Sequence, residues 1–177
     1  MKKLATITGN PLVANGIAVV IAIAAYLIVY KGIWKISPPP WVRGAGFILL
    51  IVFAILFLLL HELIHMLAAN IFAQGAGASL HIRAVVWECR LKKPLARNHY
   101  IVYALAPGVF IAGLAFVLFY ILNSPDLKFF TAIGFVIGLS SAGGDYWFVA
   151  KILKFPKESL IFDYGMQMEI VMAEDGD

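Results

Sequence analysis

Residues 61–65 read HELIH, and this pentapeptide is the strongest chemical signal in the chain. On an α-helix, residues four positions apart share a face, so His61 and His65 can hold one metal ion. Glu62, one position further round, can reach a water molecule on that metal and take its proton. We therefore expect a zinc site, with His61 and His65 as ligands and Glu62 as the catalytic base.

The sequence around this motif is that of a membrane-spanning segment. The preceding residues 44–60 (GAGFILLIVFAILFLLL) carry no charge. Ionisable groups at membrane depth cost about 2.5–3.5 kcal/mol each on insertion scales and are functional by default. In the alternative interpretation, the three polar side chains reach the membrane interface from a helix end. Apolar residues still follow at 66–73, so we favour the metal site.

The composition predicts an all-α polytopic membrane protein. The chain has 177 residues, is 62% hydrophobic and has a mean hydropathy of +0.90, whereas soluble domains are about 45–50% apolar. We expect one integral-membrane domain, residues 1–177, with a three-helix catalytic core (46–153) and a short polar tail (154–177). The four predicted transmembrane helices cover approximately residues 11–30, 46–73, 100–122 and 129–153.

The segments outside these helices carry weaker signals. Lys2 and Lys3 before the first apolar run resemble the start of a signal peptide. That run, however, is longer than the usual core of about 7–15 residues, so we expect a retained helix. Residues 79–91, between the second and third helices, predict a small β-hairpin or strand, and residues 159–164 a further strand. Asp163 and Glu169 are expected to lie in a solvated tail.

Charge predicts orientation rather than nucleic-acid binding. The net charge of +4 comes from basic residues in the loops that flank the apolar spans. Four spans place ten Lys and Arg residues with the two termini and four on the opposite side, so we expect both termini in the cytoplasm of a prokaryotic cell. The single cysteine, Cys89, excludes an internal disulfide and a cysteine-rich zinc site.

A zinc site of this type needs a third protein ligand, and Asp145 is the leading candidate. It lies 16 residues into the fourth predicted helix, much as His61 lies 15 residues after Gly46, so the two reach similar depths. An interhelical hydrogen bond or a pair with Lys151 is the alternative role. Further residues that the sequence suggests are two reserve ligands (His81, His99) and four residues that could line the site or contact substrate (Asn70, Pro107, Gly143, Gly144).

The order of these motifs resembles that of membrane-embedded metalloproteases of the site-2 protease type. It resembles more closely the DUF3267 group of zincin peptidases, over residues 57–165. The matching stretches are HELIHMLAAN, KPLARNHYIVYALAPGVF, SSAGGDYWFVAKILKFP and FDYG. The resemblance implies a zinc peptidase with an aspartate ligand on a later helix, which in this chain is Asp145.

These observations predict a zinc-dependent endopeptidase in the lipid bilayer. Its substrate would be an extended peptide segment, such as part of another membrane protein, paired with the predicted strand at 79–91. The alternative is a non-catalytic metal-binding scaffold, or pseudoprotease, that holds a client protein. Glu62 weighs against it, because a binding-only site needs no base beside the metal. A metal permease would need several polar groups along a path, and the sequence has one cluster.

Overall fold

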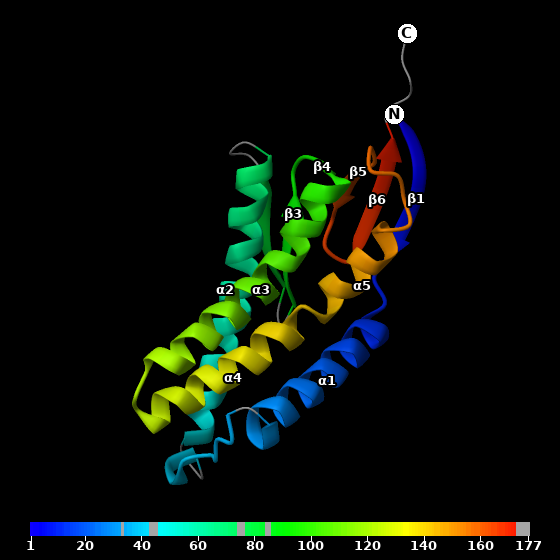
Figure 1. Ribbon diagram of the computed structural model, residues 1–177. Helices are drawn as coiled ribbons and strands as arrows, with labels where there is room; N and C mark the ends of the chain where they lie inside the picture. The colour runs from blue at the N-terminus through cyan, green and yellow to red at the C-terminus, as the bar shows by residue number, and fades with distance from the viewer. Residues whose placement is uncertain (33, 43–45, 74–76, 84–85, 173–177) are drawn as a thin grey trace.

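The computed structural model describes residues 1–172, apart from residues 33, 43–45, 74–76 and 84–85. Long helices form a bundle, and the strands gather at one end of it, together with the N-terminus (Figure 1). In chain order the elements are β1 (Lys2–Thr8), α1 (Pro11–Leu27), the π-helical turn η1 (Ile28–Gly32), the 3-10 turn η2 (Pro40–Val42), α2 (Gly46–Phe72), β2 (Ala78–Arg83), β3 (Val86–Leu91), β4 (Leu95–Ala96), α3 (Arg97–Ile121), α4 (Pro125–Ser141), α5 (Gly143–Ile152), β5 (Leu160–Asp163) and β6 (Gln167–Met172).

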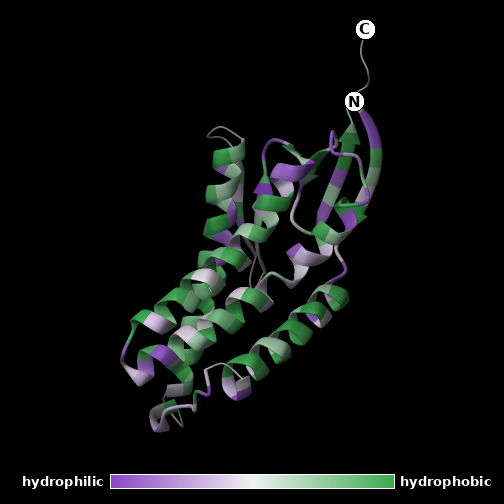
Figure 2. Cartoon of the chain, viewed as in Figure 1, coloured by the Kyte–Doolittle hydropathy of each residue, from purple (hydrophilic) through white to green (hydrophobic). Residues whose placement is uncertain are grey.

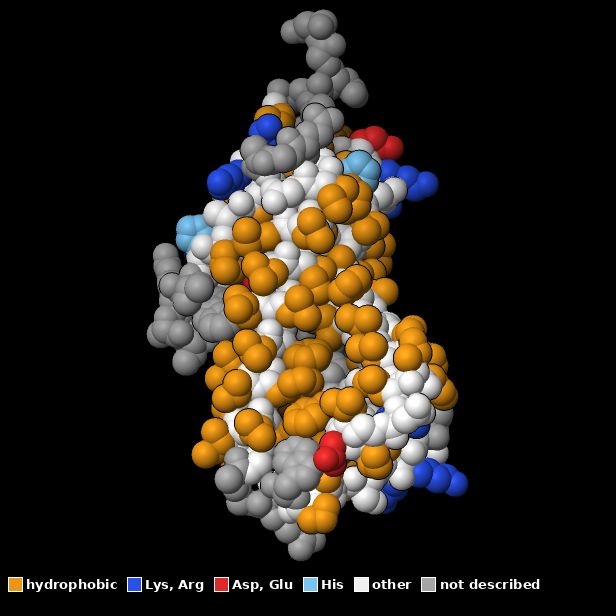
Figure 3. All heavy atoms as spheres, turned by 90° about the vertical axis from the view of Figure 1, so that its left-hand side faces the viewer, with side chains coloured by type: hydrophobic (Ala, Val, Ile, Leu, Met, Phe, Trp, Pro, Cys, Tyr) orange, Lys and Arg blue, Asp and Glu red, His pale blue; other side chains and the backbone are white. Residues whose placement is uncertain are grey.

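Among the residues that the structure describes, four helical segments are long and apolar enough to cross a membrane, as the sequence predicted. They cover Pro11–Gly32, Gly46–Phe72, Arg97–Ile121 and Pro125–Ile152. Hydrophobic residues dominate the helices (Figure 2), and apolar side chains cover most of the helical face that Figure 3 shows. Leu12 is 83% and Ile48 64% exposed. Such a surface fits a membrane protein, because burial in an apolar medium stabilises exposed apolar side chains.

The ends of these helices follow local chemistry. Asn10 caps α1, because its side-chain oxygen accepts hydrogen bonds from the backbone N–H groups of Leu12 and Val13 at 3.1 and 3.3 Å. Proline occupies the first position of both α1 and α4, where no intrahelical N–H bond is lost. The fourth span begins at Pro125, four residues earlier than the predicted start at residue 129. It is also interrupted at Ala142, so α4 and α5 are separate helices.

The predicted helical fold with a small hairpin or strand did not include the larger sheet at one end of the bundle. Strands β1, β6, β5 and β4 form a four-stranded antiparallel sheet in that order. Strand β1 pairs with the far end of the chain, from Lys2 opposite Met172 to Thr8 opposite Gln167. Local sequence patterns cannot predict a partner so distant. Residues 2–8, which precede α1, thus form a strand of this sheet.

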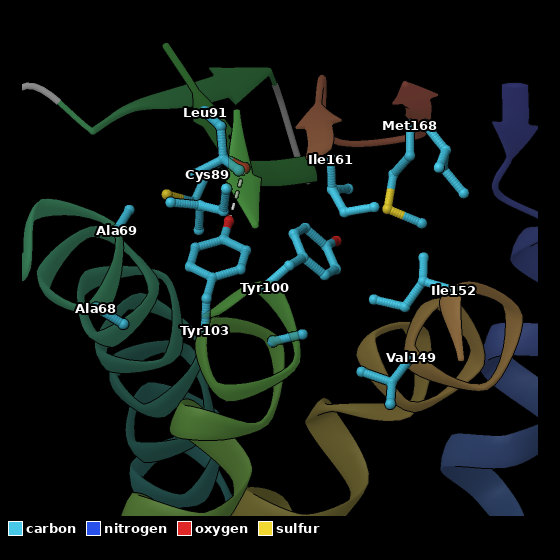
Figure 4. Packing of buried hydrophobic residues seen from close by; sticks show 13 residues of the cluster. Ala68, Ala69, Cys89, Leu91, Tyr100, Tyr103, Val149, Ile152, Ile161 and Met168 are labelled. Carbon is cyan, nitrogen blue, oxygen red and sulfur yellow. Dashed lines mark hydrogen bonds between the residues drawn. The ribbon is translucent and has the colours of Figure 1, made fainter. Parts of the chain in front are cut away.

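A second, two-stranded sheet consists of β2 and β3, which pair from Ala78 opposite Leu91 to Arg83 opposite Val86. Buried side chains of α2, α3, α5 and both sheets meet in an apolar cluster where the strands pack on the helices (Figure 4). Tyr100 and Ile161 in this cluster are 1% and 0% exposed. This cluster fixes the strands against α2, α3 and α5, which carry the candidate site.

Candidate metal centre

Three of the predicted residues meet inside the bundle. His61 and His65 project from one face of α2, and Asp145 comes from the first turn of α5. The two histidine Nε2 atoms are 3.2 Å apart, and Asp145 Oδ2 lies 3.2 Å from His61 Nε2. Asp145 Oδ1 lies 3.4 Å from His65 Nε2. Both histidines are buried, at 5% and 4% exposed, so the cluster is shielded from bulk solvent.

This spacing fits a zinc ion. Nitrogen and oxygen ligands at about 2.0–2.1 Å from a tetrahedral zinc lie about 3.3 Å from one another. The two Nε2 atoms are 3.2 Å apart, and each lies close to a different oxygen of Asp145, at 3.2 Å for His61 and 3.4 Å for His65. When one ligand atom is taken from each residue, all three atoms lie within 4.8 Å of one another. Three protein ligands leave a fourth position for water or substrate, as catalytic zinc sites require.

The Nδ1 atom of each imidazole ring also has a hydrogen-bond partner. His65 Nδ1 lies 3.1 Å from the carbonyl oxygen of Tyr103, which can only accept, so Nδ1 carries the ring proton and donates it. His61 Nδ1 lies 3.1 Å from Ser141 Oγ. The Ser141 hydroxyl donates to the carbonyl of Gly138 at 3.4 Å, which leaves its oxygen free to accept from His61. These two contacts favour, in each ring, the tautomer whose unprotonated Nε2 faces the other ligand atoms.

This tautomer assignment gives a chemical reason for a cation at the cluster. In this tautomer the Nε2 lone pairs of His61 and His65 and the carboxylate of Asp145 converge on one buried space. Such a set of acceptors repels itself unless a positive charge lies among them. Hydrogen bonding of the outer ring nitrogens is also the usual second interaction of metal-binding histidines.

Glu62 lies beside this cluster in a cavity of about 200 Å³. The cavity wall is formed by α2, β3, α3, the junction of α4 and α5, and the turn between β5 and β6. Glu62 is half-buried and interacts with the backbone of Cys89 on β3. Tyr103 also reaches β3, since its hydroxyl donates to the Cys89 carbonyl at 3.4 Å (Figure 4). A carboxylate, a three-ligand cluster and a strand therefore share one cavity.

The interruption at Ala142 directs Asp145 into the cluster. It lets α5 start in a new direction, with Asp145 in its first turn. At Gly143 an added Cβ would lie 2.7 Å from the carbonyl oxygen of Ala14 and 2.9 Å from the backbone nitrogen of Ala18. Glycine therefore permits α1 to approach the start of α5. The first span thus packs directly behind the predicted aspartate ligand.

The remaining predicted residues have different positions. Gly144 lines the cavity, whereas Pro107 is fully buried within α3. Asn70 accepts a hydrogen bond from the backbone N–H of Gly77 at 3.1 Å, an interaction at the end of α2. The reserve ligands lie outside the cluster: His81 is 3.0 Å from Ser79 Oγ, and the ring of His99 stacks on Phe72.

Ser141 and Asp163 were missed by the sequence reasoning. Ser141 lies four residues before Asp145, a spacing that could have placed both near one site. Asp163 is not in a solvated tail, because it is 6% exposed and lines the cavity. Its oxygens accept from the Tyr100 hydroxyl and the Gly165 N–H, both at 2.7 Å. Burial raises the pKa of Asp163 to about 7, although these hydrogen bonds act in the opposite direction.

A model of the protein family DUF3267, described as "Putative zincin peptidase", matches residues 53–160. The chain belongs to this family. The matched region contains the HELIH motif, Pro107 and Asp145, while α1 and the strands β1 and β6 lie outside it. Searches of curated proteins and of solved structures gave no match.

Proposed function

We propose that this member of the family is a zinc-dependent integral-membrane endopeptidase. The observation that carries the proposal is the convergence of three ligand side chains, His61, His65 and Asp145, in the cavity that also contains Glu62. The family description supports the same class of enzyme. A scaffold that only held a metal would have no use for a carboxylate beside it.

In the proposed reaction the protein's own side chains hold the metal, orient its ligands and transfer protons. Zinc, when bound, supplies Lewis-acid chemistry that polarises a scissile carbonyl and lowers the pKa of a water toward about 7. Glu62 takes a proton from the attacking water and later gives it to the leaving amine. Ser141 and the Tyr103 carbonyl keep the two imidazoles in the required tautomer.

The depth of the site suggests which part of a substrate is cut. His65 lies seven residues before the end of α2 at Phe72, and Asp145 lies seven before the end of α5 at Ile152. At about 1.5 Å per residue, the cluster is roughly 10 Å from the helix ends nearest the strands. We infer that the scissile bond belongs to an extended segment close to that membrane surface. Glu88 and Cys89 of β3 line the cavity, which favours pairing of this segment with the β2–β3 hairpin.

The proposed orientation places the strands in the cytoplasm. The N-terminus, the β2–β3 hairpin and the C-terminal strands lie at the same end of the bundle (Figure 1). Ten of the fourteen basic residues belong to the segments on that side. By the positive-inside rule, the cavity would then be reached from the cytoplasmic surface of the cell membrane.

The test compares the unmodified protein with Glu62→Gln, both zinc-loaded, on a mixture of quenched fluorescent apolar peptides in detergent. Loss of a general base lowers rates by typically 10²–10⁴-fold, so the variant should cleave almost nothing while keeping its metal. A variant that cleaves at the unmodified rate would contradict the mechanism. An unmodified protein that binds zinc and captures peptides without cleaving them would favour the scaffold.

A further inference from the structure

Pro107 lies inside α3, fully buried, four residues after Tyr103. In a regular α-helix the backbone N–H of each residue donates to the carbonyl four residues earlier. Proline has no backbone N–H, so the carbonyl of Tyr103 cannot receive that bond from residue 107. An α-helical carbonyl buried in this way needs another donor.

The donor that reaches this carbonyl is a predicted metal ligand. His65 Nδ1 lies 3.1 Å from the carbonyl oxygen of Tyr103. The centroids of the His65 imidazole and the Tyr103 phenol ring are 4.7 Å apart. His65 is 4% exposed and Tyr103 is 2% exposed, so water cannot easily replace either partner. The bond fixes the proton on Nδ1 and turns Nε2 toward Asp145, 3.4 Å away.

We propose that Pro107 is a positioning residue for the metal ligand His65, because it withholds the N–H that would otherwise compete for the Tyr103 carbonyl. The inference rests on the proposed metallopeptidase site. It gives the proline a role that is distinct from bending the helix. Any residue other than proline at position 107 would offer its backbone N–H to the Tyr103 carbonyl and so weaken the hydrogen bond from His65 Nδ1.

The neighbouring glycine has a separate, steric role. A Cβ at Gly108 would lie 2.8 Å from the Tyr146 hydroxyl and 3.1 Å from the Ala142 Cβ. Gly108 thus lets α3 approach the junction of α4 and α5. The contribution of Pro107 can therefore be tested at its backbone nitrogen, without disturbing this contact.

The experiment places either alanine or lactic acid at position 107 and measures zinc affinity by competition with a chelating dye. The two variants have the same side chain, but the lactic ester has no N–H. Loss of a second interaction to a metal-binding histidine costs typically 10–100-fold in affinity, so Pro107→Ala should bind zinc weaker by about that factor. The ester variant should bind zinc almost as tightly as the unmodified protein. Pro125→Ala, at the first position of α4, is the control for loss of a proline ring.

The proposal is overturned if Pro107→Ala keeps full zinc affinity. It is equally overturned if the ester and alanine variants lose affinity to the same extent, because ring packing would then explain the effect. An unmodified protein that binds no zinc would instead contradict the proposed site itself. Nitrogen NMR of the His65 ring provides a second readout, since the inference predicts loss of a fixed Nδ1 proton in the alanine variant alone.

Discussion

Substitution of Gly143 tests whether α1 positions the aspartate ligand. A Cβ at this residue would lie 2.7 Å from the Ala14 carbonyl oxygen, and ordinary contacts begin at 3.4 Å. The start of α5 would therefore have to move by about 0.7 Å, more than the roughly 0.5 Å that a preorganised site tolerates. Because Asp145 is two residues further on, we expect Gly143→Ala to weaken zinc binding by about 10–100-fold.

The matched control is the neighbouring glycine. A Cβ at Gly144 meets only the Ala14 Cβ, at an ordinary 3.9 Å. Both substitutions replace a glycine in the first turn of α5 by alanine, and only the one at Gly143 forces a close contact with α1. Zinc affinity is measured for both in detergent by competition with a chelating dye. Equal affinities in the two variants would refute the idea that α1 sets the position of Asp145.

Three further predictions concern the parts around the site. Burial raises the pKa of Cys89 from 9.0 to about 12, so iodoacetamide at pH 8 should modify the folded protein about a thousandfold more slowly than the denatured chain; equal rates would contradict this. Because Cys89 is the only cysteine, single labels can report orientation: Lys157→Cys should react from the cytoplasm and Ser37→Cys from outside. Labelling of both from one side would exclude the four-span topology. The pKa of Asp163 rises from 3.8 to about 7 on folding, so its stabilising contribution is complete below pH 3.8 and is lost as the pH rises through 7. This difference corresponds to at most about 4 kcal/mol. Unfolding by SDS at pH 5 and pH 7.5 should therefore show a smaller pH effect for Asp163→Asn than for the unmodified protein.

Much of the membrane part could be predicted from the sequence, because its signals are local. An apolar run long enough to cross a bilayer is visible without any partner, and the spacing of His61 and His65 defines a helical face. Asp145 could be matched to His61 by counting residues along two helices. The structure brings these three side chains together.

The strands and the supporting contacts could not be predicted in the same way. Strand β1 depends on β6, which lies at the opposite end of the chain. Asp163, the last residue of β5, is buried because it and the turn that follows it line the cavity, and nothing in its neighbouring sequence indicates that. The role of the Tyr103 carbonyl is a backbone property, which only the position of Pro107 four residues later could have suggested.

Zinc content tests the central claim most directly. We expect the purified protein to carry about one zinc ion per chain, as a three-ligand open site requires. His61→Ala and His65→Ala should lose it almost completely, and Asp145→Ala should bind zinc weakly. If Asp145→Ala retains zinc with unchanged affinity, the third ligand lies elsewhere and the proposed metal centre is wrong.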